Sequence, residues 1–471
     1  MTKSNDLIER IEAQGAIFGH PKGLYLLFFT EMWERFSYYG MRGLLTLYMI
    51  KMWSQNGLGI AEDKASLIYG FFTGFVYFTP IIGGMIADRY IGQRKAITIG
   101  GITMFFGQLV LFAMHSHLGL GIGLVLLILG NGMFKPNIST MVGQLYREGD
   151  DKRDSAFSIF YMGINLGAFL APLIAGTLAE EWFAVKAASG EIISYGFKYG
   201  FLAAAVGMAL GQVVFNLYAS KYLLEIGTAP AKTEPTIIQN ADATKAASLS
   251  KIEKQRIAVI VILTFFVIFF WAGFEQAGSS MTIYTDKYID RNLFGWVIPT
   301  TYFQSVNPLF IVALGPLFAW FWTSKYGKKL STPTKMSLGM ILLGIGFLFM
   351  LMATYGVQTQ GSGDQEVVMK KAALIWLVMT YFFHTVGELC LSPVGLSVVT
   401  KLAPIKLASM LMGVWMLSSF AANIIGGFIA AYVEQLGAAT IFVSIAVFVI
   451  ALGVLMLLLS KQLSKMMHGV K

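Results

Sequence analysis

Twelve stretches of about 20 or more mainly apolar residues, separated by short polar breaks, dominate this chain. About 20 apolar residues in a helix span the hydrocarbon core of a bilayer. Of the 471 residues, 56% are hydrophobic and 13% are charged, and a soluble protein of this length could not bury so much apolar surface. The sequence therefore predicts an all-α membrane protein with twelve transmembrane helices. We expect them at 23–50, 65–87, 95–114, 118–145, 155–180, 197–220, 256–284, 296–323, 336–356, 371–400, 407–433 and 438–460.

The polar segments indicate how the chain is oriented. The first twenty residues are polar and several spans follow, which indicates that no cleavable signal peptide is present. With the N-terminus inside, the cytoplasmic segments hold 24 Lys and Arg residues and the outer loops hold 8. This asymmetry predicts cytoplasmic termini in a multi-pass protein, and we expect a bacterial inner membrane. The net charge of +9 therefore reflects orientation in the lipid bilayer, and we expect no nucleic-acid partner.

The longest polar interruption, about Lys221 to Arg256, lies between the sixth and seventh predicted spans. It predicts an N-terminal six-helix bundle at 1–220, a cytoplasmic linker at 221–255 and a C-terminal six-helix bundle at 256–471. Two halves joined in this way build the major facilitator fold, whose substrate site lies between the halves near mid-membrane. The loop GGMIADRYIGQRKA at 83–96 resembles the signature between the second and third helices of that superfamily. A simpler interpretation of this loop is a basic anchor on the cytoplasmic side.

Seven charged residues lie inside the predicted spans and away from their ends, where each costs roughly 2.5–3.5 kcal/mol on insertion scales and so needs a partner or a function. They are Glu31, Glu34, Arg35, Arg42, Lys135, Glu275 and Glu388. Four acids face three bases, so simple pairing leaves one carboxylate over. A carboxylate without a countercharge titrates readily, as a proton carrier should.

The first span places its charged residues on one helical face. Glu34, Arg35, Tyr38 and Arg42 follow Glu31 at separations of 3, 4, 7 and 11 residues. This pattern predicts a polar face that lines an aqueous cavity. The alternative is that Glu31 with Arg35, and Tyr38 with Arg42, only satisfy each other in the core.

The other charges suggest partners in opposite halves. Lys135 precedes Pro136 in GNGMFKPNIS, and a single membrane lysine is either an ion-pair partner or an anion ligand. We favour an anion ligand, with Glu388 as its partner when the site is empty. Arg42 is the expected partner of Glu275, so that protonation of Glu275 would release Arg42 and loosen a gate.

The segment EMWERFSYYGMRG at 31–43 resembles the ExxERFxYYG motif in the first helix of the proton-dependent oligopeptide transporter family. Similar matches follow in order along nearly the whole chain. They are IYGFFTGFVYFTPIIGG around Tyr77, GNGMFKPN around Lys135, FSIFYMGINLGAFLAPL at 157–173, WAGFEQ at 271–276, VNPLF at 306–310, GELCLSP at 387–393 and MGVWMLSSFAANIIGG at 412–427.

The resemblance implies a symporter that imports di- and tripeptides with protons by alternating access, as a monomeric functional unit and with no cofactor besides the coupling proton. The residues that would hold the peptide carboxylate are Arg35, Lys135, Tyr38 and Tyr77. Those that would hold its amino terminus are Asn165, Asn307 and Glu388, assisted by Ser392. Glu31, Glu34 and Glu275 would carry the proton, with Arg42 as gate partner, and Trp271 and Trp415 would form side-chain pockets.

Other functions fit the sequence less well. A symporter of another solute such as nitrate would use the same fold, but it would need one cation and no opposing Glu388. A channel or receptor lacks support, because no selectivity ring or sensor domain is recognisable. An enzyme is not expected, since no nucleophile motif, nucleotide loop or metal cluster is apparent, and the single Cys390 lies in a span. Without the motif matches, the better interpretation of Trp271 and Trp415 would be core packing. For His384 we expect a structural role.

Overall fold

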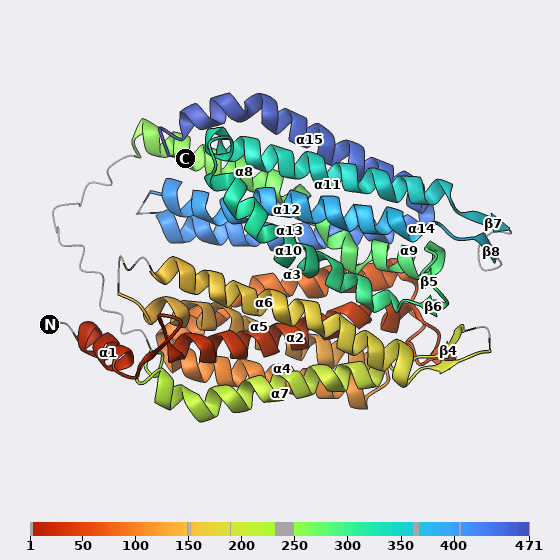
Figure 1. Cartoon of the computed structure of the whole chain (residues 1–471), viewed down its shortest axis with the longest axis horizontal. Coiled ribbons are helices and arrows are strands. Elements are labelled where there is room, and N and C mark those ends of the chain that lie inside the picture. The colour runs from red at the N-terminus through yellow and green to blue at the C-terminus, as the bar shows by residue number, and fades with distance from the viewer. Residues whose placement is uncertain are drawn as a thin grey trace. The chain divides into compact units, whose positions relative to one another are not determined.

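The computed structural model of the chain describes residues 3–147, 150, 152–188, 190–230, 249–360, 367–404 and 407–470. Long helices dominate it, and the strands form four short antiparallel hairpins (Figure 1). The helices are α1 (Lys3–Glu12), α2 (Lys22–Ile50), α3 (Glu62–Ile86), α4 (Gln93–Ala113), α5 (His117–Gln144), α6 (Lys152–Gly176), α7 (Phe197–Tyr222), α8 (Lys251–Phe274), α9 (Ser280–Tyr288), α10 (Val306–Thr323), α11 (Thr332–Tyr355), α12 (Leu374–Leu402), α13 (Ala408–Ala431), α14 (Val433–Leu436) and α15 (Ala438–Met466).

The hairpins join the ends of helices. They pair β1 (Ala16–Ile17) with β2 (His20–Pro21), β3 (Val185–Lys186) with β4 (Ile192–Ser194), β5 (Asn292–Leu293) with β6 (Trp296–Val297), and β7 (Gln358–Gln360) with β8 (Val367–Lys370). Short 3₁₀ turns are η1 (Trp53–Gln55), η4 (Glu275–Gly278), η5 (Thr300–Ser305) and η6 (Gly327–Lys329), and π-helical turns are η2 (Ala87–Ile91) and η3 (Thr177–Trp182).

Eleven helical segments of the described chain are long and apolar enough to cross a membrane. They correspond to the predicted spans from 65–87 onward. Helix α2 covers the first predicted span, 23–50, and has 29 residues. It differs from the others in its charges, Glu31, Glu34, Arg35 and Arg42. The predicted all-α architecture is confirmed, whereas the count of twelve spans and the cytoplasmic termini stay predictions.

The chain divides into two compact units. Unit 1 comprises Met1–Gly59 and Phe75–Ala241, and unit 2 comprises Ile60–Gly74 and Asp242–Lys471. Helix α3 therefore contributes its first half to unit 2 and its second half to unit 1. The linker expected at 221–255 includes 231–248, which lie outside the described residues, so the bundle boundaries stay predictions.

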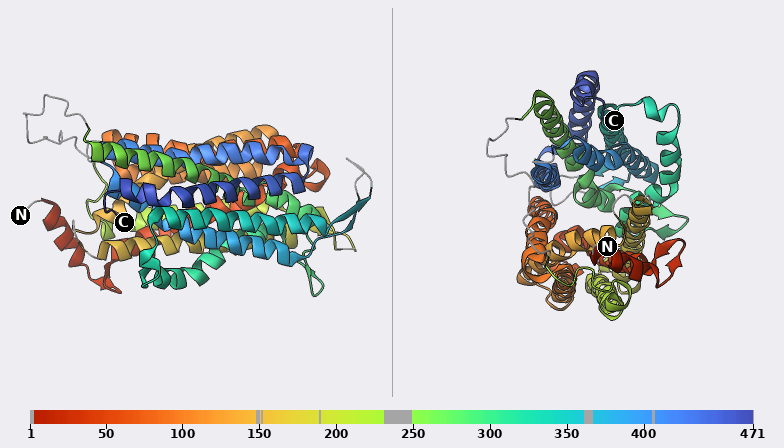
Figure 2. Two further views of the ribbon diagram at one scale, coloured as in Figure 1. Left: turned by 90° about the horizontal axis from the view of Figure 1, so that it is seen from above. Right: turned by 90° about the vertical axis from the view of Figure 1, so that its left-hand side faces the viewer.

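In unit 1 the long helices lie side by side, with α2 against α6 and α7, and α4 against α5 and α7 (Figures 1 and 2). The short helix α1 is amphipathic and buries Ile8 and Ile11. Its Arg10 forms an ion pair of 3.0 Å with Glu225, which follows the end of α7. The polar start of the chain is therefore a docked helix of unit 1.

In unit 2, α11 packs against α12 and α15, and α8 packs against α13. The first half of α3 crosses α13 at two glycines. A Cβ atom on Gly70 would lie 2.7 Å from the Cα atom of Gly427, so a larger residue would separate the two helices. Small residues at helix crossings are how membrane helices approach closely without a hydrophobic driving force.

Candidate functional site

Three charged residues of α2 form a buried ionic cluster in unit 1. The Arg35 guanidinium donates through Nη2 to Glu34 Oε1 at 2.7 Å and through Nε to Glu34 Oε2. Its Nε also lies 3.3 Å from Glu31 Oε1. The three side chains are at most 4% exposed. One guanidinium therefore contacts two carboxylates in a place where an uncompensated charge is costly.

Helix α5 adds two polar side chains to this cluster. Asn131 donates from Nδ2 to Glu34 Oε1 at 3.1 Å. Lys135 lies one turn later, with Nζ 4.7 Å from the centre of the Tyr77 ring, and its charge acts on Glu31. Because Pro136 has no backbone N–H, the helix lacks one hydrogen bond next to this lysine. Unit 1 therefore holds the predicted cationic residues Arg35 and Lys135 close to Glu31.

Two tyrosine rings accompany the cations of α2. The Arg35 Cζ atom lies 5.3 Å from the centre of the Tyr38 ring, and the Arg42 Cζ atom lies 5.8 Å from the Tyr39 ring. Cations over aromatic faces are stabilised by the ring quadrupole, more so where water is excluded. Tyr38 is therefore placed beside Arg35, as the helical spacing predicts.

Asn165 lies on α6 and is 6% exposed. Its Nδ2 donates to the carbonyl of Tyr161 at 2.9 Å. Two positions later, a Cβ atom on Gly167 would lie 2.4 Å from the Met32 carbonyl oxygen and 3.0 Å from Arg35 Cβ. Glycine at 167 therefore lets α6 approach α2 beside Arg35, and this contact places the helix that carries Asn165 next to the ionic cluster.

In unit 2, Asn307 and Glu388 are brought together by α10 and α12. Asn307 Nδ2 donates to Glu388 Oε2 at 2.9 Å and lies 3.0 Å from Thr385 Oγ1. Glu388 is 8% exposed. Ser392 is half-buried one turn beyond it on α12. The donor that holds the Glu388 carboxylate is therefore neutral. Among the described residues of unit 2, no cation bonds this carboxylate.

Glu275 occupies a break between two helices. The span predicted at 256–284 is present, but it is interrupted: helix α8 ends at Phe274, a 3₁₀ turn begins at Glu275, and α9 begins at Ser280. Gln276 supports the break by donating to the carbonyls of Ala272 and Gly426. The charge of Glu275 acts on Glu388. Such 3₁₀ turns inside a helical segment frequently mark functional hinges.

The remaining predicted residues of unit 2 are in its core. Trp415 is buried in the main hydrophobic cluster, and Trp271 packs against that cluster and against Phe274. His384 lies with its ring 4.7 Å from that of Phe347. Glycine at 346 makes room for it, because a Cβ atom there would lie 2.3 Å from His384 Cδ2.

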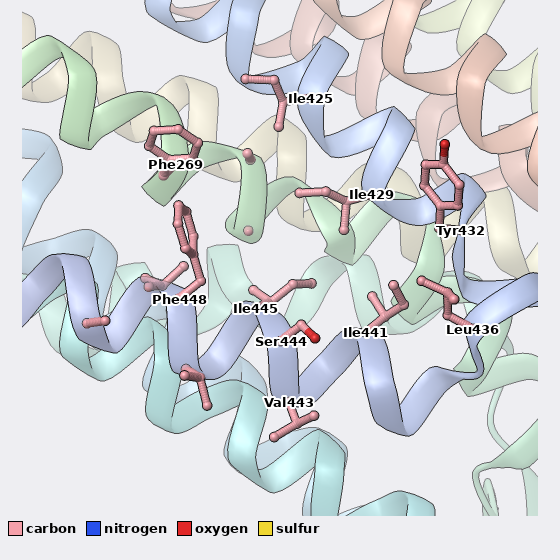
Figure 3. A pocket seen from close by; sticks show the side chains of 15 residues that line it. Phe269, Ile425, Ile429, Tyr432, Leu436, Ile441, Val443, Ser444, Ile445 and Phe448 are labelled. Atoms are coloured by element: carbon pink, nitrogen blue, oxygen red, sulfur yellow. The ribbon is translucent and has the colours of Figure 1, made fainter.

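A separate cavity of about 750 Å³ lies between α8, α13 and α15. Figure 3 shows apolar side chains such as Phe269, Phe448 and Ile429 directed into it, with the hydroxyl of Tyr432 at one end. None of its described lining residues is charged. It offers no charged group for the two ends of a zwitterion, so it is not the candidate site.

Sequence reasoning missed Asn131 and Thr385. Asn131 lies four residues before Lys135, and Thr385 lies three residues before Glu388, so helical spacing could have suggested both. The proposed pairs Lys135 with Glu388 and Arg42 with Glu275 join residues of different units, and they stay predictions.

Buried ionisable clusters inside membrane-crossing helices are typical of ion and solute transporters. The comparisons agree with this class of protein. A family model described as the POT family matches residues 94–227 and 228–458. The chain is therefore a multi-pass membrane protein that belongs to the POT family.

Individual relatives cover nearly the whole chain. The uncharacterized transporter YclF of Bacillus subtilis (strain 168) is 37% identical over 509 residues, covering 99% of this chain and 99% of that protein. A di-/tripeptide transporter of Lactococcus lactis subsp. cremoris is 31% identical, covering 98% and 99%. The crystal structure of a mutant peptide transporter in complex with alafosfalin has a TM-score of 0.87 at 35% identity and covers 100% of both chains. This likeness confirms the predicted major facilitator fold.

Proposed function

We propose that the protein is a symporter of a bacterial inner membrane that imports di- and tripeptides together with protons. The observation that carries the proposal is the cluster in which Glu31 and Glu34 share the guanidinium of Arg35. A second carboxylate on one cation favours uptake of a proton, and release of that proton restores the charge. A cluster of this kind can therefore couple a proton gradient to movement of the helices around it.

The charges of the two units suit a short zwitterion. Of the seven ionisable residues predicted inside spans, unit 1 holds the three cations together with Glu31 and Glu34, a balance of one positive charge, whereas unit 2 holds only the carboxylates Glu275 and Glu388. In this proposal Arg35, Lys135, Tyr38 and Tyr77 hold the peptide carboxylate. Asn165, Asn307, Glu388 and Ser392 hold the amino terminus, and Trp271 and Trp415 contact peptide side chains. Protons are the coupling ion, and the functional unit is a monomer.

The relatives support peptides as the substrate. The Lactococcus relative is a di-/tripeptide transporter, and the solved structure holds alafosfalin. The nitrate alternative is not favoured, because a nitrate site has no use for the Asn307–Glu388 pair, which lacks positive charge.

Uptake by the purified chain in liposomes tests the proposal. Labelled dialanine should accumulate under an inward proton gradient, and an unlabelled tripeptide should compete, whereas free alanine and nitrate should not. Gradient-driven uptake of nitrate in place of dialanine would overturn the substrate assignment and keep the fold.

A separate substitution tests the proposed role of Glu275, with Arg42 as its partner, in proton coupling. Glu275→Gln removes the charge at the break between α8 and α9, so gradient-driven accumulation should be lost while exchange of peptide across the membrane persists. The control is Glu253→Gln, which removes a carboxylate from the first turn of α8. The neighbouring Gln276 is not used as a control, because its side chain bonds two backbone carbonyls. Undiminished accumulation in Glu275→Gln would remove Glu275 from the mechanism.

A further inference from the structure

A second pocket, of about 350 Å³, lies in unit 1 between the first turn of α4 and the last turns of α7. These two helices pack side by side (Figure 1). Its lining includes Arg94, Lys95, Thr98, Ile99, Asn216 and Ser220. It therefore combines two cations and three polar side chains with an apolar wall, at the end of a pair of membrane-crossing helices.

Neither cation forms an ion pair with a carboxylate among the described residues, although the charge of Glu225 acts on Arg94. Arg94 is held by neutral carbonyl groups, since Nε donates to Ile226 at 2.7 Å and Nη2 donates to Leu224. Lys95 is exposed and makes no hydrogen bond or ion pair with a described residue. The first turn of α4 has no acidic residue and no side-chain cap, so its N-terminal dipole adds further positive potential. The pocket is thus built for an anion.

The polar wall is ordered. Thr98 Oγ1 donates to Asn216 Oδ1 at 2.8 Å, and Asn216 Nδ2 donates to the carbonyl of Gln212 at 2.8 Å. These bonds join α4 to α7 and fix the width of the pocket. Ser220 lies one turn after Asn216 on the same helical face and offers a hydroxyl to a ligand.

Apolar faces continue from the pocket along both helices. On α4, Ile99, Ile102 and Phe106 are 45–53% exposed and follow one another on one face. On α7, Val213 lies on the face of Asn216 and is 55% exposed. At the pocket end of α7, Tyr218 and Tyr222 stack with ring centres 5.9 Å apart. Tyrosines of this kind concentrate where a membrane meets water, which places the pocket at the level of lipid head groups.

We propose that this pocket binds one anionic phospholipid, with its phosphate against Arg94 and Lys95 and its acyl chains along the exposed faces of α4 and α7. Basic pockets between membrane helices bind anionic head groups by the same physics. The apolar faces distinguish this ligand from a free phosphate, which would use the cations and leave the faces unexplained.

Lipid binding to the purified, delipidated chain tests the proposal by native mass spectrometry. Phosphatidylglycerol and phosphatidylcholine with identical acyl chains are titrated separately, and inorganic phosphate is added as a competitor. One phosphatidylglycerol should bind more tightly than phosphatidylcholine. Lys95→Gln should weaken the binding of phosphatidylglycerol about fivefold, because one lysine near an anionic lipid contributes about that factor. Lys198→Gln, an exposed lysine at the opposite end of α7, should leave it unchanged.

A bimane label locates the lipid. Cys390 is buried, so the label is placed on Ser220→Cys and, as control, on Lys198→Cys. Brominated phosphatidylglycerol should quench the label at 220 at lower concentration than brominated phosphatidylcholine, with no such difference at 198. Equal affinities for the two lipids, an equal loss in Lys95→Gln and Lys198→Gln, or displacement by millimolar inorganic phosphate would overturn the proposal. None of these readouts depends on transport, so they stand apart from the proposed function.

Discussion

The side-chain amide of Asn307 donates a hydrogen bond of 2.9 Å to Oε2 of Glu388 inside unit 2. This bond holds a buried carboxylate with a neutral donor, and in the proposed mechanism the carboxylate binds the ammonium group of the peptide. Thr385 on the same helix lies within hydrogen-bond distance of Asn307 and orients the amide.

Glu388→Gln keeps the shape of this site and removes its charge. A hydrogen bond to a charged group contributes about 1.5–3 kcal/mol, so the affinity for dialanine should fall at least about tenfold. N-acetyl-dialanine has no ammonium group, and its weaker inhibition should not change. The measurement is inhibition of labelled dialanine exchange in liposomes.

Thr385→Val is the matched control for this pair, because it removes a partner of Asn307 and leaves the carboxylate in place. It should weaken dialanine binding less than about threefold, in keeping with a neutral hydrogen bond. An equal loss for dialanine and for its acetylated form in Glu388→Gln would show that Glu388 does not read the amino terminus.

Removal of Arg35 tests the ionic cluster of α2 through stability. Arg35→Met leaves Glu31 and Glu34 without their guanidinium, and breaking a buried pair costs about 3–5 kcal/mol. Asn131→Leu removes one neutral donor from Glu34 and should cost about 1 kcal/mol. Thermal unfolding in detergent should therefore show a much larger fall in Tm for Arg35→Met. A larger fall for Asn131→Leu would contradict the role given to the cluster.

The contact between α6 and α2 tests the placement of Asn165. Gly167→Leu would drive a side chain into the Met32 carbonyl, which lies 2.4 Å from the Cβ position, so we expect little folded protein in the membrane. Gly121→Ala on α5 is the control, since nothing lies within 4 Å of its Cβ position. Size-exclusion profiles of the two variants give the result. A monodisperse Gly167→Leu variant with unchanged Tm would rule out this helix contact.

Tyr146, which follows the end of α5, gives a prediction for pH dependence. Burial, and then the neighbouring charges of Asp150 and Tyr25, raise the pKa of Tyr146 above its ordinary value of about 10. In the unfolded chain this tyrosine ionises near pH 10, whereas in the folded chain it stays neutral. Its contribution to stability is therefore complete below about pH 10 and is lost as pH rises further.

Tyr146→Phe should flatten this loss. Between pH 9 and 11 the wild-type chain should lose up to about 1.4 kcal/mol per pH unit more than the variant. At neutral pH the variant should be slightly less stable, because the hydroxyl lies 2.8 Å from His20 Nδ1. Chemical denaturation at several pH values measures both effects, and parallel pH profiles for the two proteins would contradict the account.

Much of the fold was predictable because long apolar stretches have few alternatives in a bilayer. The charges in the spans were equally informative, since each must be compensated. Spacing alone placed Glu31, Arg35 and Tyr38 together, and the structure agrees.

Other features depend on partners distant in the sequence. Asn131 reaches Glu34 from α5, and Gly167 meets Met32 from α6, contacts that a local pattern does not contain. The sequence near Glu275 contains no proline that would have predicted the break. The break depends instead on the hydrogen bond from Gln276 to Gly426 on α13. The short helix α1 buries Ile8 and Ile11. It was not predicted, because the segment that contains it is mainly polar.

Proton movement coupled to peptide entry is the most direct test of the proposed symport. The purified chain is placed in liposomes that contain a pH-sensitive dye, with equal pH on both sides and a potassium diffusion potential that is negative inside. Addition of dialanine should acidify the interior, whereas free alanine should not, and Glu31→Gln should abolish the signal. Entry of labelled dialanine with no acidification would contradict proton coupling and leave a peptide transporter of another mechanism.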